Sequence, residues 1–299
     1  FGHDPRFKFA ASRAIYKGMV KFLAFQHGVD YVIQPLPVDH FSITKLDGKK
    51  VRLSWEPVLD SLETSAVPTA YKVYRRTGDL GFDNGTKIHG NSMELELENY
   101  GEIYSFKITA MNEGGESSAS EILSVGLIEN DTSPVLVVNA FDRVAAPAVF
   151  DEGSFAGMAY WDDEGVADKY NIGYTGTQYD FDRQSPWLDD DSPGWGASHG
   201  DMEGKLIPGN SFDNTYIHGK SILAAGHSFI STSDGSFGDP EFDTTPYPIV
   251  DLIFGEEKTT ISLGKKYFQV FDKRMQQKIT DFTRAGGNIF ASGAYIGSD

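Results

Sequence analysis

Apolar residues near the start of the chain recur every three or four positions, which is the spacing of one face of an α-helix. Asp4 and Pro5 are typical of a first helical turn, and Gly28 is a typical stop. The stripe consists of Ala11, Ile15, Met19, Phe22 and Phe25. Because a helix gains most of its stability by burying one face, we expect residues 1–30 to be the last helix of a domain that lies upstream.

The pattern changes to alternation of apolar and polar residues after about residue 36. Short alternating runs are separated by turns rich in Gly, Asp, Asn and Ser. The runs are Phe41–Leu46, Val51–Trp55, Tyr71–Tyr74, Met93–Leu97, Tyr104–Ala110 and Ile122–Val125. About seven strands in roughly 90 residues predict an all-β sandwich.

A third pattern begins with Pro134–Ala140, a continuous run that is rich in β-branched residues. Such a run is typical of a strand buried on both faces, as in a parallel sheet covered by helices. Similar runs are Ser221–Ala225, Ile249–Phe254 and Asn288–Ser292, and a helical face made of Phe271, Met275, Ile279 and Phe282 precedes the last. This order predicts an open α/β parallel sheet over 133–299. Since the chain stops after a strand and its turn, we expect this domain to be truncated.

Residues 151–220 interrupt the third pattern with a stretch that is rich in Asp, Gly, Trp, Tyr and Ser and lacks periodicity. Long loops are usually functional or disordered, and the aromatic content argues against disorder. Exposed Trp or Tyr rings can stack on sugar rings. Clustered carboxylates can bind calcium, for which Asp189, Asp190 and Asp191 are candidates, although the spacing of an EF-hand is absent. A solvated acidic loop is the alternative.

The charge balance narrows the class of partner. The chain has 26 basic and 43 acidic residues, a net charge of -17, and no run of Lys or Arg. Nucleic acid, anionic membranes and acidic polymers are therefore poor partners, and a neutral or mixed-charge partner fits better. No apolar run is long enough to span a membrane. The absence of cysteine excludes disulfides, thiolate metal sites and a cysteine nucleophile.

Ligands of open parallel sheets bind beyond the carboxyl ends of the strands. The polar residues expected at that rim are Asn139, Asp142, Arg143, His227, Glu256, Glu257, Ser292 and Tyr295. Asp142 or Glu256 would act as a general base there. His227 would transfer protons and Ser292 would be a nucleophile. No spacing among these residues forms a specific signature, and we expect a structural role for His218.

The residues of the predicted sandwich resemble those of a known family. The positions on which the resemblance rests are Trp55, Tyr71, Val73, Arg75, Leu97, Gly101, Tyr104, Phe106, Ile108, Ala110, Asn112, Gly115 and Ser117. With these residues, 36–127 resembles a fibronectin type III domain in which Tyr104 is the tyrosine of the tyrosine corner. The interval from Leu97 to Tyr104 is one residue longer than usual. The resemblance implies a spacer or a binding platform and assigns no chemistry.

The N-terminal stretch from Asp4 to Gly18 resembles the final helix of N-acetylmuramoyl-L-alanine amidases in multidomain bacterial envelope proteins, some of them labelled xanthan lyases. The resemblance implies a parent in which zinc, held by His and Glu, activates water to cleave peptidoglycan. Those ligands would lie upstream, because His3 alone cannot form a zinc site. The resemblance also implies a secreted, periplasmic or cell-surface location.

Residues 286–297 resemble the strand-to-turn region of class I glutamine amidotransferase-like domains. Active members of that family carry a cysteine at the turn, where Ala294 stands here. Ser292 comes too early and is expected inside the strand. Since a methyl group cannot attack a carbonyl, the resemblance implies an α/β domain that binds or supports rather than catalyses.

Together these features predict an accessory region of a cell-wall amidase-like protein, which positions cell-wall or polysaccharide substrate without cleaving it and needs no cofactor of its own. A hydrolase or polysaccharide lyase that uses the rim residues is one alternative, with Glu256, His227 and Ser292 as the first positions to mutate. A purely structural spacer is the other. Turnover by this chain alone would favour the first alternative, and failure to bind any glycan would favour the second.

Overall fold

The computed structural model describes residues 5–141, 149–159, 161, 176–200, 213–255, 257, 259–262, 265–267 and 269–297. The N-terminal helix α1 (Pro5–His27) ends where the sequence predicted. Gly28 follows it with a φ of 64°, a backbone conformation that favours glycine. None of the helices in these ranges is long and apolar enough to cross a membrane.

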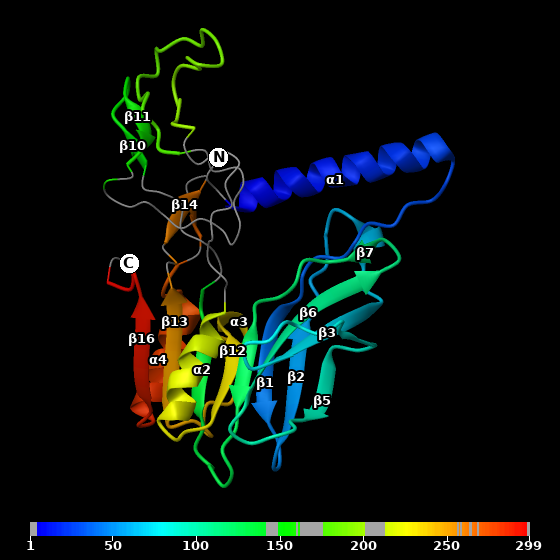
Figure 1. Ribbon diagram of the computed structural model, residues 1–299, viewed down its shortest axis with the longest axis vertical. Coiled ribbons are helices and arrows are strands. Elements are labelled where there is room, and N and C mark those ends of the chain that lie inside the picture. The colour runs from blue at the N-terminus through cyan, green and yellow to red at the C-terminus, as the bar shows by residue number, and fades with distance from the viewer. Residues whose placement is uncertain are drawn as a thin grey trace.

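α1 is attached to the rest of the molecule by its polar face rather than by its apolar stripe. Arg13 and Lys17 form ion pairs with Asp60 at 2.8 and 2.5 Å. Large apolar side chains point to solvent instead, with exposed fractions of 61% for Met19 and 82% for Phe25. The helix crosses one end of the sandwich, near β7 (Gly115–Glu116) (Figure 1). The predicted stripe is therefore present and uncovered.

The β-sandwich forms as the alternation predicted, and all of its strand pairs are antiparallel. One sheet contains β1 (Asp39–Lys45), β2 (Lys50–Glu56) and β5 (Ser92–Glu96). The other contains β3 (Ala70–Thr77), β4 (Thr86–Ile88), β6 (Ile103–Asn112), β7 and β8 (Leu123–Gly126). A single 3₁₀ turn, η1 (Thr64–Ala66), lies between β2 and β3. Inward-facing residues of both sheets, among them Phe41, Trp55 and Phe106, make the core.

Tyr104 occupies the tyrosine-corner position and is fully buried. Its hydroxyl accepts a hydrogen bond from the Asn99 amide at 3.0 Å and donates one to Glu102 at 2.8 Å. Tyr104→Phe leaves the amide without this acceptor, so we expect it to lower the free energy of unfolding by about 1–3 kcal/mol. Urea unfolding measures the loss. Tyr100→Phe is the control, because the Tyr100 side chain is 36% exposed, and an equal effect of both changes would contradict the prediction.

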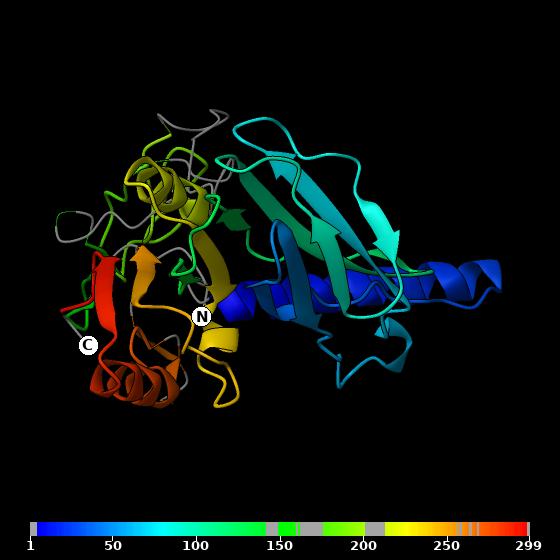
Figure 2. The same cartoon turned by 90° about the horizontal axis from the view of Figure 1, so that it is seen from below.

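The remainder of the chain is a mixed region of strands and helices. Strands β9 (Val135–Asn139), β12 (Phe229–Ser233), β13 (Ile249–Gly255) and β16 (Asn288–Gly293) pair in parallel in the order β16-β13-β9-β12. Helices α2 (Asn214–Ala224) and α4 (Lys273–Arg284) lie on opposite sides of these strands (Figure 2). Leu223 of α2 packs with Ile253, whereas Met275 of α4 belongs to the cluster that contains Leu252.

The mixed region does not form a separate sheet, contrary to the prediction of an independent open sheet. β12 pairs antiparallel with β8 through Phe229 and Gly126, and with β1 through Thr232 and Ser42, so sandwich and mixed region share one 12-stranded sheet. Where β8 leaves β12, the Ser231 hydroxyl accepts from the Ser124 amide at 2.7 Å and donates to the Ser124 carbonyl at 2.6 Å. These bonds keep the backbone groups at the junction satisfied.

The strand predicted at Ser221–Ala225 is wrong, because residues 221–224 belong to α2 and Ala225 is its C-cap. A short apolar run cannot distinguish a buried strand from a buried helix segment. Here Ile222 and Leu223 form the packed face of the helix, and the strand that follows is β12. Short α3 (Asp234–Phe237) comes directly after β12, capped by the Ser233 hydroxyl.

Two small hairpins lie beyond the carboxyl ends of the parallel strands. One is formed by β10 (Val149–Asp151) and β11 (Ala156–Met158), and the other by β14 (Thr260–Ser262) and β15 (Lys265–Tyr267). The first belongs to the insertion, which extends from the side toward which β13 and β16 point (Figure 1). The insertion therefore occupies the side at which parallel sheets usually bind ligands.

Candidate functional sites

The carboxyl rim brings together part of the predicted residue set. Asn139 ends β9 and Ser292 lies in β16, and the two residues occupy the register positions on either side of Ile253. Glu257 follows β13 and is 3% exposed, as is Asn139. Tyr295 lies in the turn after β16. Asp142, Arg143 and Glu256, also predicted here, lie outside the described residues.

His227 does not lie at the rim, because it precedes β12 and so stands at the amino end of that strand. The prediction placed it after a strand that is in fact α2. His227 and Ser292 are therefore at opposite ends of the sheet and cannot act in one centre. Ala294 is the first residue after β16, and its amide donates to the Gly255 carbonyl at 2.8 Å. Ser292 lies inside β16, as the sequence indicated.

Sequence reasoning missed one pair of ionisable side chains. His218 of α2 lies with Nδ1 2.7 Å from Oδ2 of Asp251 in the middle of β13. The Asp251 side chain is 8% exposed, and its other oxygen has no hydrogen-bond partner among the described residues. A buried carboxylate at hydrogen-bond distance from an imidazole fixes the orientation of the ring. The available signal was an aspartate within the apolar run Ile249–Phe254.

The insertion is held together by ring packing and by hydrogen bonds to its backbone. Phe150, Trp161 and Phe181 form a cluster with ring centroids 5.6 to 6.0 Å apart. The Trp195 indole donates to the Ala156 carbonyl at 2.7 Å. Arg183 lies 5.2 Å from the centroid of Trp195. The described segments of the insertion thus have an ordered framework.

Large aromatic side chains on this framework remain open to solvent. Three of the four tryptophans of the chain lie here, with exposed fractions of 67% for Trp161, 65% for Trp187 and 48% for Trp195. Phe155 and Tyr179 are about half exposed as well. We call these five residues the aromatic surface. Exposed apolar groups gathered in one region mark interaction sites more often than chance.

The acidic run in the insertion forms a turn. The Asp189 carboxylate accepts hydrogen bonds from the amides of Asp191 and Ser192 at 3.0 and 2.8 Å. Asp190 and Asp191 are exposed. Across the described part of the chain, no three His, Asp or Glu residues gather in a way that could hold a metal ion. Calcium binding by these residues stays a prediction.

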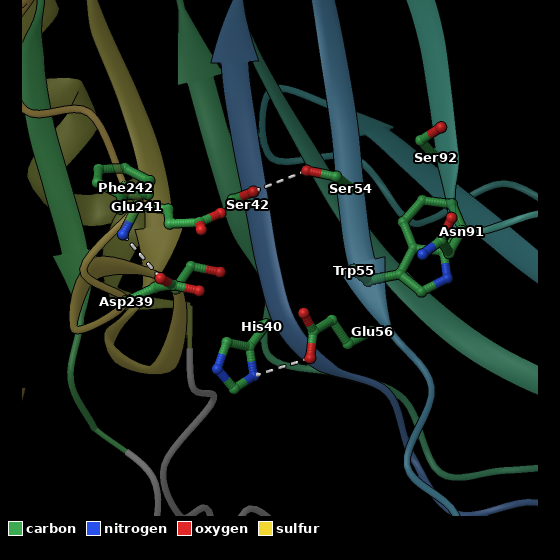
Figure 3. Close-up of a pocket in the computed structure, with 11 residues that line it drawn as sticks. His40, Ser42, Ser54, Trp55, Glu56, Asn91, Ser92, Asp239, Glu241 and Phe242 are labelled. Atoms are coloured by element: carbon green, nitrogen blue, oxygen red, sulfur yellow. Dashed lines mark hydrogen bonds and ion pairs between the residues drawn. The ribbon is translucent and has the colours of Figure 1, made fainter.

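A pocket of about 340 Å³ lies where the sandwich meets the mixed region (Figure 3). One wall is the outer face of β1 and β2, and the other is the loop that follows α3. Figure 3 shows Asp239 of the loop across from His40 and Glu56, and Glu241 across from Ser42. We call this cavity the junction pocket. Its walls come from segments about two hundred residues apart, so no sequence motif marks it.

The sequence matches no protein-family model and no curated protein sequence. Its structure is similar to the kinase region of C. elegans twitchin, at 24% identity and a TM-score of 0.29, over 32% of this chain and 17% of that one. A fourth FNIII domain from human matches at 21% identity and a TM-score of 0.29, over 33% of this chain and 86% of that one. The FN3 domain of human collagen XX matches at 16% identity and a TM-score of 0.25, over 32% and 97%.

About a third of the chain is a fibronectin type III-like domain. The match to twitchin spans less than a fifth of that protein's chain, so nothing of its kinase region is carried over. The comparisons assign no amidase or xanthan lyase family. A fibronectin type III-like fold by itself assigns no chemistry.

Proposed function

We propose that this chain is a non-catalytic accessory region that binds an uncharged polysaccharide through the aromatic surface of its insertion. The observation that supports the proposal is the exposure of Trp161, Trp187 and Trp195 on a framework held by ring packing and hydrogen bonds. A flat indole ring offers a wide apolar face to the C–H groups of a sugar ring and loses little conformational entropy on binding.

Charge and position favour the same class of ligand. Asp180, Asp182 and Asp190 belong to the same segment of the chain as the exposed rings, and carboxylate oxygens can accept hydrogen bonds from sugar hydroxyls. A net charge of -17 disfavours a strongly anionic polymer. The insertion also lies beyond the carboxyl ends of the parallel strands, on the side where such sheets usually bind ligands (Figure 1).

We also propose that the chain is part of a larger cell-wall amidase-like protein. The uncovered apolar stripe of α1 is consistent with a helix that packs on an upstream amidase-like domain, and that domain would hold the zinc ion. The mixed region would be a degenerate, class I glutamine amidotransferase-like α/β domain, with Ala294 in place of the reactive cysteine. Such a protein would be secreted, periplasmic or on the cell surface, and its ligand would be cell-wall or related glycan.

Binding to neutral polysaccharides and to purified peptidoglycan tests the proposal. Trp187→Ala removes a ring that is 65% exposed and that has no ring stacking or side-chain hydrogen bond within the described segments, and we expect it to weaken binding by about tenfold. The double variant Trp161→Ala, Trp187→Ala should bind still more weakly. Leu80→Ala is the control, because Leu80 is 68% exposed but belongs to the sandwich.

Two results would overturn the proposal. One is binding by the double variant that equals that of the unchanged chain. The other is cleavage of the glycan by the purified chain, which would favour the rim hydrolase or lyase instead. A Ser292→Ala variant that stopped such cleavage would place the reactive centre at the rim.

A further inference from the structure

We propose that the junction pocket is a second binding site, which takes a small organic cation with a primary ammonium group. This site is independent of the polysaccharide binding proposed above. The pocket is concave, has room for a molecule of the size of a monosaccharide or an amino acid, and lies between two rigid walls.

The strand wall presents a row of polar side chains. Along β1 and β2, alternate residues point outward, so His40, Ser42, Ser54 and Glu56 share the face opposite the sandwich core. The Ser42 and Ser54 hydroxyls lie 2.9 Å apart and are hydrogen-bonded to each other. The register of β1 with β2 shifts between Asp39 and Ser42, a bulge that redirects the side chain at position 40.

The loop wall is fixed in place. The Lys278 ammonium donates hydrogen bonds to the carbonyls of Asp239 and Phe242 at 2.8 and 2.6 Å. The Asp239 carboxylate accepts from the Glu241 amide at 2.8 Å. Phe242 packs against buried Phe237 with ring centroids 6.1 Å apart. The carboxylates of this wall therefore reach the pocket from a pre-organised loop.

The charges that line the pocket favour a cation. Glu56, Asp239 and Glu241 contribute carboxylates, and the described lining contains neither Lys nor Arg. Lys278 of α4 is the cation that contacts the loop, and its ammonium donates to two loop carbonyls. The carboxylates come from opposite walls of the pocket, and among the described residues no three of them are close enough together to bind a metal ion. An organic cation long enough to contact both walls fits this arrangement, whereas an anion would be repelled by the three negative charges.

His40 occupies an unusual position in the strand wall. Nδ1 of His40 is buried and has no hydrogen-bond partner among the described residues, with carboxylate oxygens of Asp39 and Glu56 3.5 and 3.9 Å away. His40 also has a φ of 51°, a conformation that is unfavourable for a residue with a Cβ. Strained backbone persists where the surroundings require it, often at ligand sites.

The test is a titration followed by amide chemical shifts of the ¹⁵N-labelled chain. Glucosamine and lysine amide both carry an ammonium, while glucose, N-acetylglucosamine and glucuronate do not. We expect millimolar binding of the amines, with shifts at His40, Glu56 and Glu241, and none there with the other three sugars. If glucosamine binds more tightly, the ammonium group of the ligand belongs to an amino sugar. If lysine amide binds more tightly, it belongs to a peptide.

Variants check that the pocket carboxylates cause the binding. Glu56→Gln and Glu241→Gln keep the shape of each side chain and should each weaken amine binding about three- to tenfold. Glu94→Gln is the matched control, because Glu94 lies on β5 in an exposed ion pair with Arg52. Circular dichroism confirms that each variant is folded, and Trp187→Ala should bind amines normally. Equal binding of glucose and glucosamine, or unchanged binding by both pocket variants, would overturn the inference.

Discussion

Phe229→Ala is expected to lower the free energy of unfolding by about 3–5 kcal/mol, the usual cost of removing a buried phenylalanine ring. Phe229 is fully buried where β12 meets both β8 and β9. Its ring lies so close to Gly219 of α2 that a Cβ added there would be 2.1 Å from the ring, and a Cβ added to Gly126 of β8 would be 2.8 Å from it. The ring therefore joins the sandwich to the mixed region.

Thermal or urea unfolding of the whole chain measures this loss. Phe290→Ala is the control, since Phe290 lies in the same sheet but is 58% exposed, and it should change stability by less than about 1 kcal/mol. Because one sheet runs through both parts, the unchanged chain should unfold in a single transition. Two separate transitions, with Phe229→Ala affecting only one, would show that the parts are independent.

Asp60→Asn is expected to release α1 from the sandwich. The Asp60 side chain is 9% exposed and pairs with both Arg13 and Lys17, whose side chains are 11% and 15% exposed. Without the carboxylate, these two cations lose their partner in a partly buried position, so amide exchange in α1 should speed up on the order of a hundredfold. Glu94→Gln is again the control, because an exposed ion pair contributes little. Unchanged exchange would mean that other contacts hold α1.

Acid should release α1 in the same way. Burial tends to raise the pKa of Asp60, but hydrogen bonds from Lys17, Arg13 and the Leu62 amide outweigh it and lower the pKa from 3.8 to about 2. A depressed folded-state pKa means that the contribution to stability is complete above the unfolded value and is lost as the pH falls through the folded value. α1 should therefore stay attached at pH 5 and detach between about pH 4 and pH 2. Release at higher pH would contradict this assignment.

The regular parts of the fold were predictable because their periodicity is local. α1, the sandwich strands and α4 follow spacings that one segment specifies by itself. A strand was predicted at Ser221–Ala225, where the structure has the end of α2. A short apolar run is compatible with either a strand or a helix, and packing of the helix against Phe229 decides between them. The direct pairing of β12 with β1 depends on residues about 190 positions apart, which no local pattern reveals.

The candidate sites also differ in whether a local sequence pattern or contacts between distant residues form them. The aromatic insertion was visible from composition alone, since three tryptophans fall within a stretch without periodicity. His218 and Asp251 could not be paired in advance, because they are joined only by the packing of α2 over β13. His227 was misplaced for the reason that α2 was misread. The junction pocket needs His40 and Asp239 on facing walls, which only the folded chain supplies.

Indole ¹⁵N–¹H spectra during a titration with neutral polysaccharide test the central claim most directly. The chain has four tryptophans, and buried Trp55, at 2% exposure, serves as an internal control for the three in the insertion. Polysaccharide binding through the aromatic surface predicts that the Trp161, Trp187 and Trp195 signals shift or broaden while that of Trp55 stays unchanged. Indole signals that all remain in place at saturating glycan would contradict it.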